Sequence, residues 1–169
     1  MTKTKAKFVL AAFTAALLAT SAPVQAKQVE FDQASIPELE AAMAAGTLTS
    51  EKLVQLCLDR IKAFDREGPK VHAVMAINAK ALEEARALDA ERKAGKVRGP
   101  LHGIPVVLKD NYNTVEMPTT GGSVILEGSI PSSDAYMVKR LRDAGAIMLD
   151  RKSTRLNSSH TDISRMPSS

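Results

Sequence analysis

The chain has 169 residues, of which 44% are apolar and 25% are charged, and this composition is typical of a single globular domain. Its net charge of +4 comes from the two ends. Residues 1–26 hold three lysines and no acid, and residues 151–169 hold four basic residues and one acid, which leaves 16 basic and 18 acidic residues in between. The body of the chain therefore lacks the basic surface expected of a nucleic-acid-binding protein.

The first 26 residues have the pattern of a cleavable export signal. Three lysines within residues 3–7 precede an apolar run over residues 8–19, and Val24-Gln25-Ala26 supplies small residues at the positions that a signal peptidase reads. The apolar run is shorter than the roughly 20 residues that cross a bilayer, so no permanent membrane span is expected. We predict a mature, exported chain, periplasmic or secreted, that starts at Lys27; a buried N-terminal helix is the alternative.

Segments with helical spacing of apolar residues then alternate with short apolar runs typical of strands. This alternation favours an α/β layered fold. Ser35 and Glu38 have the spacing of a capping box at the first helix. The expected helices cover residues 35–46, 49–64, 79–94 and 133–145, and the expected strands cover residues 71–77, 104–108 and 146–149.

Each longer helix has an apolar stripe expected to face the core. The single cysteine, Cys57, lies on the second stripe and is interpreted as a buried thiol, and it excludes an intramolecular disulfide. The stripes are Leu53, Leu56, Cys57, Ile61 and Phe64 in the second helix, Ala79, Leu82, Ala85 and Leu88 in the third, and Met137, Leu141 and Ala144 in the fourth.

The run from Ile104 to Leu108 is expected to form a strand buried on both faces, and Lys109 follows it directly. A lysine at the mouth of a core can lose part of its hydration, which lowers its pKa and allows it to act as a base. A solvated lysine at a strand end is the alternative reading of Lys109.

Three segments together resemble the amidase signature family of serine amide hydrolases: Gly99–Asn111 (GPLHGIPVVLKDN), Met117–Ser123 (MPTTGGS) and Asp134–Ile147 (DAYMVKRLRDAGAI). The resemblance implies the N-terminal part of that fold, a mixed β-sheet covered by helices and incomplete here. It implies that Lys109 belongs to a Ser/cis-Ser/Lys triad and that the substrate is a small-molecule or peptide amide, with no cofactor. In the family, both serines lie in a later Gly/Ser-rich loop, which this sequence lacks.

Other polar residues near the motif have simpler interpretations. Ser123 follows a glycine pair typical of a turn, and the resemblance places it upstream of the nucleophile loop. His102 is expected to make a structural hydrogen bond, and His72 to lie at the rim of a strand. Asp110 is equally a turn residue, a lysine partner or a substrate contact. The histidines and Cys57 are too widely spaced for a metal site.

Residues 151–169 differ from the rest of the chain. They contain six serines and no apolar period, so no buried element is expected there. The segment resembles translated adapter sequence, and we hypothesise that it is not native protein. The organisation expected is therefore a signal peptide over residues 1–26, part of an amidase domain over residues 27–150, and a disordered tail.

Three functions are compatible with this organisation. The first is the N-terminal part of an exported amidase in which Lys109 is the only catalytic group present, so that the chain as written is inactive. The second is a small exported α/β binding or structural module without catalysis. The third, a subunit that amidates charged transfer RNA, shares the motif, but the export signal argues against it. No oligomeric state is specified.

Overall fold

A computed structural model describes residues 33–152 of the chain. The predicted signal peptide over residues 1–26 and nearly all of the predicted tail lie outside this part. The elements in chain order are α1 (Ile36–Ala44), α2 (Ser50–Arg60), the π-helix η1 (Ile61–Arg66), β1 (Val74–Ile77), α3 (Ala81–Lys93), β2 (Pro105–Lys109), the short 3₁₀-helix η2 (Val124–Leu126), α4 (Tyr136–Asp143) and β3 (Ile147–Lys152).

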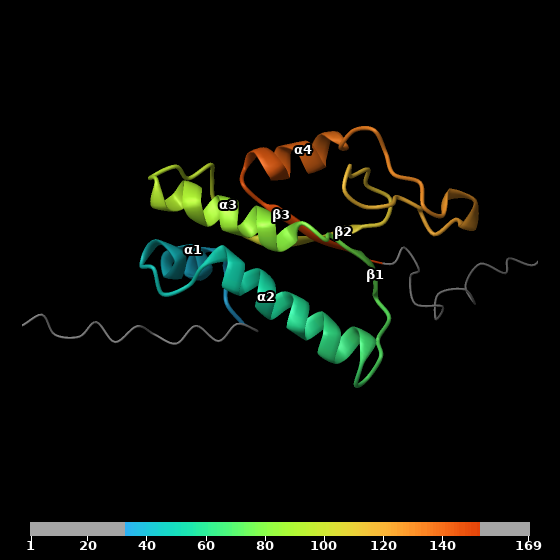
Figure 1. Cartoon of the computed structure of the whole chain (residues 1–169), viewed down its shortest axis with the longest axis horizontal. Coiled ribbons are helices and arrows are strands. Elements are labelled where there is room, and N and C mark those ends of the chain that lie inside the picture. Colours follow the sequence, from blue (N-terminus) through green and yellow to red (C-terminus); the bar gives the residue numbers. More distant parts are fainter. Residues whose placement is uncertain (1–32, 153–169) are drawn as a thin grey trace, which may run out of the picture.

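The three strands form one mixed sheet in the order β1-β3-β2. Strand β3 is central, pairing antiparallel with β1 and parallel with β2. Helices α2 and α3 pack on one face, and α4 lies across the other (Figure 1). The predicted α/β fold with a mixed sheet covered by helices is therefore confirmed.

Alternate residues of β3 supply the two cores, as strand geometry requires. Ile147 and Leu149 pack with Val54 of α2 and Leu88 of α3. Met148 points the other way, into the second core under α4. The second core consists of Leu108, Met117, Val138, Ala146 and Met148.

The first helices begin where their capping residues predict. The Ser35 backbone N–H donates to the Glu38 carboxylate at 3.0 Å, which confirms the capping box. Thr49 caps α2 by accepting a hydrogen bond from the Lys52 backbone N–H at 3.1 Å.

The inward stripe predicted for the second helix is only partly correct. Leu53 is buried, but Phe64 is 52% exposed. The cause is the change from α2 to the wider π-turns of η1 at Ile61, which rotates the later side chains away from the α-helical stripe. Cys57 is partly buried against the first core, as a core thiol should be.

The third and fourth helices are shorter than predicted, and one residue of each stripe is wrong. Ala79 is exposed because the Asn78 side chain accepts from the Lys80 N–H at 2.8 Å and thereby delays the start of α3 until Ala81. In α4 the buried residue is Val138, and Met137 is 54% exposed.

Strand β1 begins three residues later than predicted. Backbone φ angles of 54° at Lys70 and 51° at His72 are incompatible with extended structure. The buried Asp65 carboxylate then accepts from the Ala73 N–H at 2.5 Å and the Val74 N–H at 3.2 Å, and so fixes the approach to the strand.

The other two strands also differ from prediction. Strand β2 is an outer strand and is not buried on both faces, because Val107 is 53% exposed. Strand β3 extends to Lys152, and Arg151 within it is fully buried, contrary to the expectation of no buried element from residue 151 onward. Within residues 33–152, no helix is both long and apolar enough to cross a bilayer.

Candidate active site

Lys109 is the last residue of β2, and its side chain is exposed. Among residues 33–152 its ammonium group has no hydrogen-bond or ion-pair partner. The strand places it on the same face as Pro105 and Val107, because side chains two residues apart share a face. The desolvated recess predicted around Lys109 is therefore not formed by the described part of the chain.

Asp110 holds the next loop against the end of β2. Its buried carboxylate accepts hydrogen bonds from the backbone N–H of Thr120 at 3.1 Å and from the Thr120 hydroxyl, and its backbone oxygen accepts from the Gly121 N–H at 2.9 Å. Burial raises the pKa of Asp110, but the hydrogen bonds from Thr120 and Arg151 outweigh it, so the pKa lies below its ordinary value. Of the three readings predicted for Asp110, the turn residue fits these contacts.

The Gly121-Gly122-Ser123 segment forms a turn next to Asp110. Gly121 and Gly122 have φ angles of 58° and 81°, in the left-handed region that glycine adopts readily. The Ser123 N–H donates to the Thr120 oxygen at 2.9 Å and closes the turn. No hydrogen bond joins Lys109 to Ser123, so the described residues do not form a lysine-serine pair.

His102 has a structural role, as predicted. Its ring is fully buried, Nδ1 accepts from the Arg98 N–H at 3.2 Å, and Nε2 lies 3.0 Å from the Leu88 oxygen. Because Nδ1 is an acceptor, Nε2 carries the hydrogen that bonds to Leu88. The ring also packs against Gly145, where an added Cβ would lie 2.7 Å from the His102 Cα.

The other two residues considered from the sequence, His72 and Cys57, make no hydrogen bond to Lys109 within residues 33–152. His72 is exposed but precedes β1, so the expectation that it lies at the rim of that strand is wrong. Burial raises the pKa of the Cys57 thiol to about 11, and the nearby Asp150 adds to the rise. A thiol with that pKa is almost entirely protonated at neutral pH and is a poor nucleophile. Within residues 33–152, no group of histidine, cysteine and acidic side chains could hold a metal ion.

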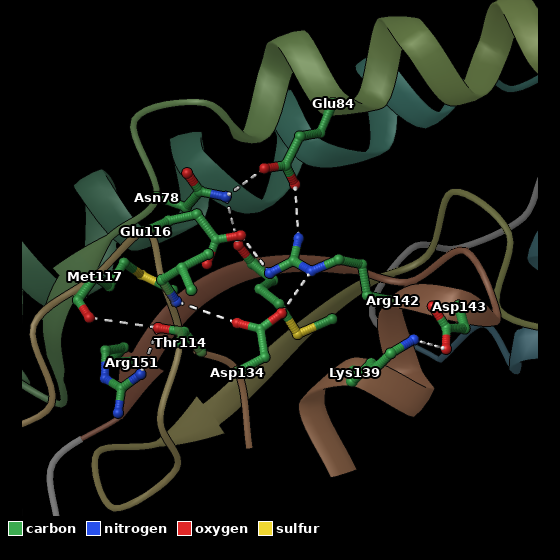
Figure 2. A network of polar contacts seen from close by, with 12 residues as sticks. Asn78, Glu84, Thr114, Glu116, Met117, Asp134, Lys139, Arg142, Asp143 and Arg151 are labelled. Carbon is green, nitrogen blue, oxygen red and sulfur yellow. Dashed lines mark hydrogen bonds and ion pairs between the residues drawn. The ribbon is translucent and has the colours of Figure 1, made fainter. Parts of the chain in front are cut away.

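Sequence reasoning missed an ionic network that fixes the loop after Lys109. Arg142 of α4 pairs with Asp134 at 3.0 Å, with Glu116, and with Glu84 of α3 at 4.0 Å (Figure 2). The Asn78 amide bridges Glu84 and the Met148 oxygen. The partners of Arg142 are 8, 26 and 58 residues away in the chain, so no local pattern indicates the network.

A second arginine, the fully buried Arg151, contacts another part of the same loop. Arg151 donates to the Asp110 carboxylate at 3.1 Å, to the Thr114 hydroxyl at 2.8 Å, and to the Tyr112 oxygen. Arg142 and Arg151 therefore both hold the loop. The neighbouring Asp150 is also buried, and within residues 33–152 its Oδ1 has no hydrogen-bond partner.

Comparisons with known proteins agree on one family. The sequence profile of the Amidase family matches residues 52–156. A glutamyl-tRNA(Gln) amidotransferase subunit of Acidothermus cellulolyticus is 48% identical over 115 residues, which are 68% of this chain and 22% of that protein.

Solved structures give the same result. The peptide amidase of Stenotrophomonas maltophilia superposes with a TM-score of 0.71 and 49% identity, covering 73% of this chain and 25% of that one. An amidase family protein of Bacillus anthracis superposes with a TM-score of 0.69 and 40% identity, covering 73% and 24%. The chain thus spans about a quarter or less of the length of these relatives.

Proposed function

Because the chain belongs to the amidase family, we propose that it is the N-terminal portion of an exported enzyme that hydrolyses carboxylic amides, with Lys109 as its proton carrier. The observation that carries this proposal is the position of Lys109, which ends strand β2 inside the matched region. The loop held by Asp110 then turns back beside it.

The chemistry needs three parts. A serine hydroxyl attacks the amide carbonyl, a base accepts its proton, and donors stabilise the oxyanion that develops. Lys109 would accept the proton through a bridging serine and return it to the leaving amine, giving an acyl-enzyme that water hydrolyses. No cofactor is needed for this sequence of steps. The acyl group of the substrate would be selected by residues outside this chain.

The chain as written is expected to be inactive. The described residues provide no serine hydrogen-bonded to Lys109, and loss of the nucleophile costs a serine hydrolase on the order of a million-fold in rate. The test is an amide hydrolysis assay on the purified chain and on the complete protein, each with and without Lys109→Ala. If the 169-residue chain is active and Lys109→Ala abolishes that activity, the proposal that the catalytic serines lie outside this chain is wrong.

Sequencing the gene beyond the codon for residue 150 distinguishes the amidase from the alternative, a small module without catalysis. A Gly/Ser-rich loop in frame supports the amidase, whereas a stop codon after uninterrupted native sequence supports a small exported α/β module without catalysis. The same read tests whether residues 151–169 are native.

Export is the second part of the proposal. The basic head, the apolar run over residues 8–19 and the small residues before Lys27 support a cleaved signal. N-terminal sequencing of the purified protein should give Lys27, and recovery of Met1 or Thr2 would contradict export. Export also favours a hydrolase over a tRNA-dependent amidotransferase, although a protein of that kind is among the similar ones.

A further inference from the structure

The backbone that carries Lys109 is fixed immediately after the lysine. The Lys109 side chain is exposed at the end of β2, whereas the next residue, Asp110, is 1% exposed. The Lys109 oxygen accepts a hydrogen bond from the Tyr112 N–H at 3.2 Å, and the Asp110 oxygen accepts one from the Gly121 N–H at 2.9 Å. The point from which the lysine side chain leaves the strand is therefore held by the turn that Asp110 begins.

Thr120 is the residue that binds the Asp110 side chain to the following loop. Its backbone N–H donates to the Asp110 Oδ1 at 3.1 Å, and its hydroxyl donates to Oδ2. The same hydroxyl accepts a hydrogen bond from the Gly122 N–H at 3.1 Å. A hydroxyl has one donor hydrogen and two acceptor lone pairs, so it can serve both partners at once. One hydroxyl thus joins the end of β2 to the glycine turn.

The charge of Asp110 strengthens this connection. Burial raises the pKa of Asp110, but the hydrogen bonds from Thr120 and then from Arg151 keep it below its ordinary value, so the side chain is a carboxylate at neutral pH. Hydrogen bonds to an ionised acceptor are stronger than those between neutral groups. Arg151 belongs to the segment hypothesised not to be native, and the Thr120 contacts do not depend on it.

A lysine that acts as a base needs such a fixed point. Its nitrogen must come within roughly 2.6–3.2 Å of the group whose proton it accepts. A displacement of about 1 Å can cost about 100-fold in rate. Because the lysine stem is long and flexible, the backbone at its root has to supply part of this precision.

We propose that Asp110 and Thr120 are positioning residues for Lys109, and that the hydrogen bonds between them fix the backbone from which the lysine reaches the reacting serine. This inference rests on the proposed function. Neither side chain is required to touch the substrate, so their effect should appear in the rate of the chemical step and not in substrate binding.

Thr120→Val in the complete enzyme is the first test, because valine keeps the shape of threonine and removes the hydroxyl. The value of kcat for amide hydrolysis should fall roughly 10- to 100-fold, while KM stays within about threefold. Thr120→Ser restores the hydroxyl and should return kcat to within about threefold of the parent. A parent-like kcat in Thr120→Val, or an equal loss in Thr120→Ser, would overturn the proposal.

Thr47→Val is the matched control. The Thr47 hydroxyl also makes one hydrogen bond to a backbone oxygen, that of Ala42 at 3.1 Å, but it lies after α1 and outside β2 and the loop that follows it. The same loss of a hydroxyl should there leave kcat and KM unchanged. An equal fall of kcat in Thr47→Val and Thr120→Val would show a general effect of losing a hydroxyl and would overturn the proposal.

The double variant Thr120→Val with Lys109→Ala shows whether Thr120 acts through the lysine. If it does, Thr120→Val should change the residual rate of Lys109→Ala by less than about twofold, because the group that it positions is already absent. A defect unrelated to Lys109 would lower the residual rate again by the factor seen in the parent, and that result would overturn the proposal.

Amide hydrogen exchange of the 169-residue chain tests the anchor without any activity. Thr120→Val should speed the exchange of the Gly122 N–H by about tenfold or more, and Thr47→Val should not. Unchanged exchange in Thr120→Val would overturn the anchor. If the anchor is present but the unmodified complete protein hydrolyses no amide, the proposed function fails and takes the positioning role with it. If that protein is active and Thr120→Val matches it, the positioning role alone fails.

Discussion

The two faces of the sheet differ in how complete they are. On the α4 face, Met148 and Val138 are fully buried, and the Arg142 network ties α3, α4 and the long loop together (Figure 2). On the other face, the core under α2 and α3 is closed, but next to it Phe64 and Val107 line an open cavity beside Lys109.

The residues that stabilise the fold and the residue proposed for catalysis therefore lie on different faces of the sheet. The closed α4 face holds the loop that follows strand β2, and it does so with residues of the described part of the chain. The open face carries Lys109, the group proposed for catalysis, beside side chains such as Val107 that are exposed within residues 33–152. Substitutions of buried side chains should therefore change stability more than substitutions of exposed ones.

The largest effect on stability is expected in the second core. Met148→Ala removes a fully buried side chain and leaves a cavity, which should lower the free energy of unfolding by about 2–5 kcal/mol. Met137→Ala is the matched control, because Met137 is 54% exposed on α4 and should change the value by less than about 0.5 kcal/mol. Denaturant unfolding of dilute protein by circular dichroism measures both. Equal losses would show that the α4 face is not closed.

A smaller effect is expected in the ionic network. Arg142→Met leaves Glu116 and Asp134 without their cation in a largely buried position, which should cost about 2 kcal/mol at pH 7. The cost should shrink as the pH falls, because burial raises the pKa of the third partner, Glu84, and its charge is then lost on acidification. Lys139→Met breaks the exposed pair with Asp143 and should cost less than about 0.5 kcal/mol. Denaturant unfolding at pH 7 and pH 4 measures the free energy of unfolding of both variants. A loss in Arg142→Met that is the same at both pH values would argue against the network.

Asp150 should make stability depend on pH. Burial raises its pKa to about 6, and the neighbouring Asp65 adds to the rise. The folded state then binds the proton more readily than the unfolded state, so stability should increase as the pH falls from above 6 towards about 4.

Asp150→Asn should remove that dependence. It should stabilise the protein by about 1–2 kcal/mol at pH 7.5 and have little effect at pH 4. Asp143→Asn, on the exposed surface of α4, should have little effect at either pH. If Asp150→Asn raises the free energy of unfolding equally at both pH values, the Asp150 carboxylate is not the source of the pH dependence.

Local patterns predicted the elements and the motif. The Ser35 capping box and the strand before Lys109 each depend on residues close in sequence, and each is present in the structure. Family membership, inferred from three short segments, is confirmed by the match over residues 52–156.

Features that depend on distant residues were not predictable in this way. The π-turns of η1 turn Phe64 outward without a glycine or proline to indicate the change. The partners of Arg142 come from three separate parts of the chain. The sequence overestimates the burial of β2 because an apolar run does not distinguish a central strand from an outer one.

The smallest effect on activity is expected from substitution of Ser123, and it tests whether Ser123 takes part in catalysis. Its backbone N–H and oxygen both serve the turn, and its hydroxyl has no hydrogen-bond partner among residues 33–152. In the complete enzyme, Ser123→Ala should therefore keep kcat/KM within about threefold, whereas Lys109→Ala should lower it by orders of magnitude. A collapse of activity in Ser123→Ala would make Ser123 part of the triad.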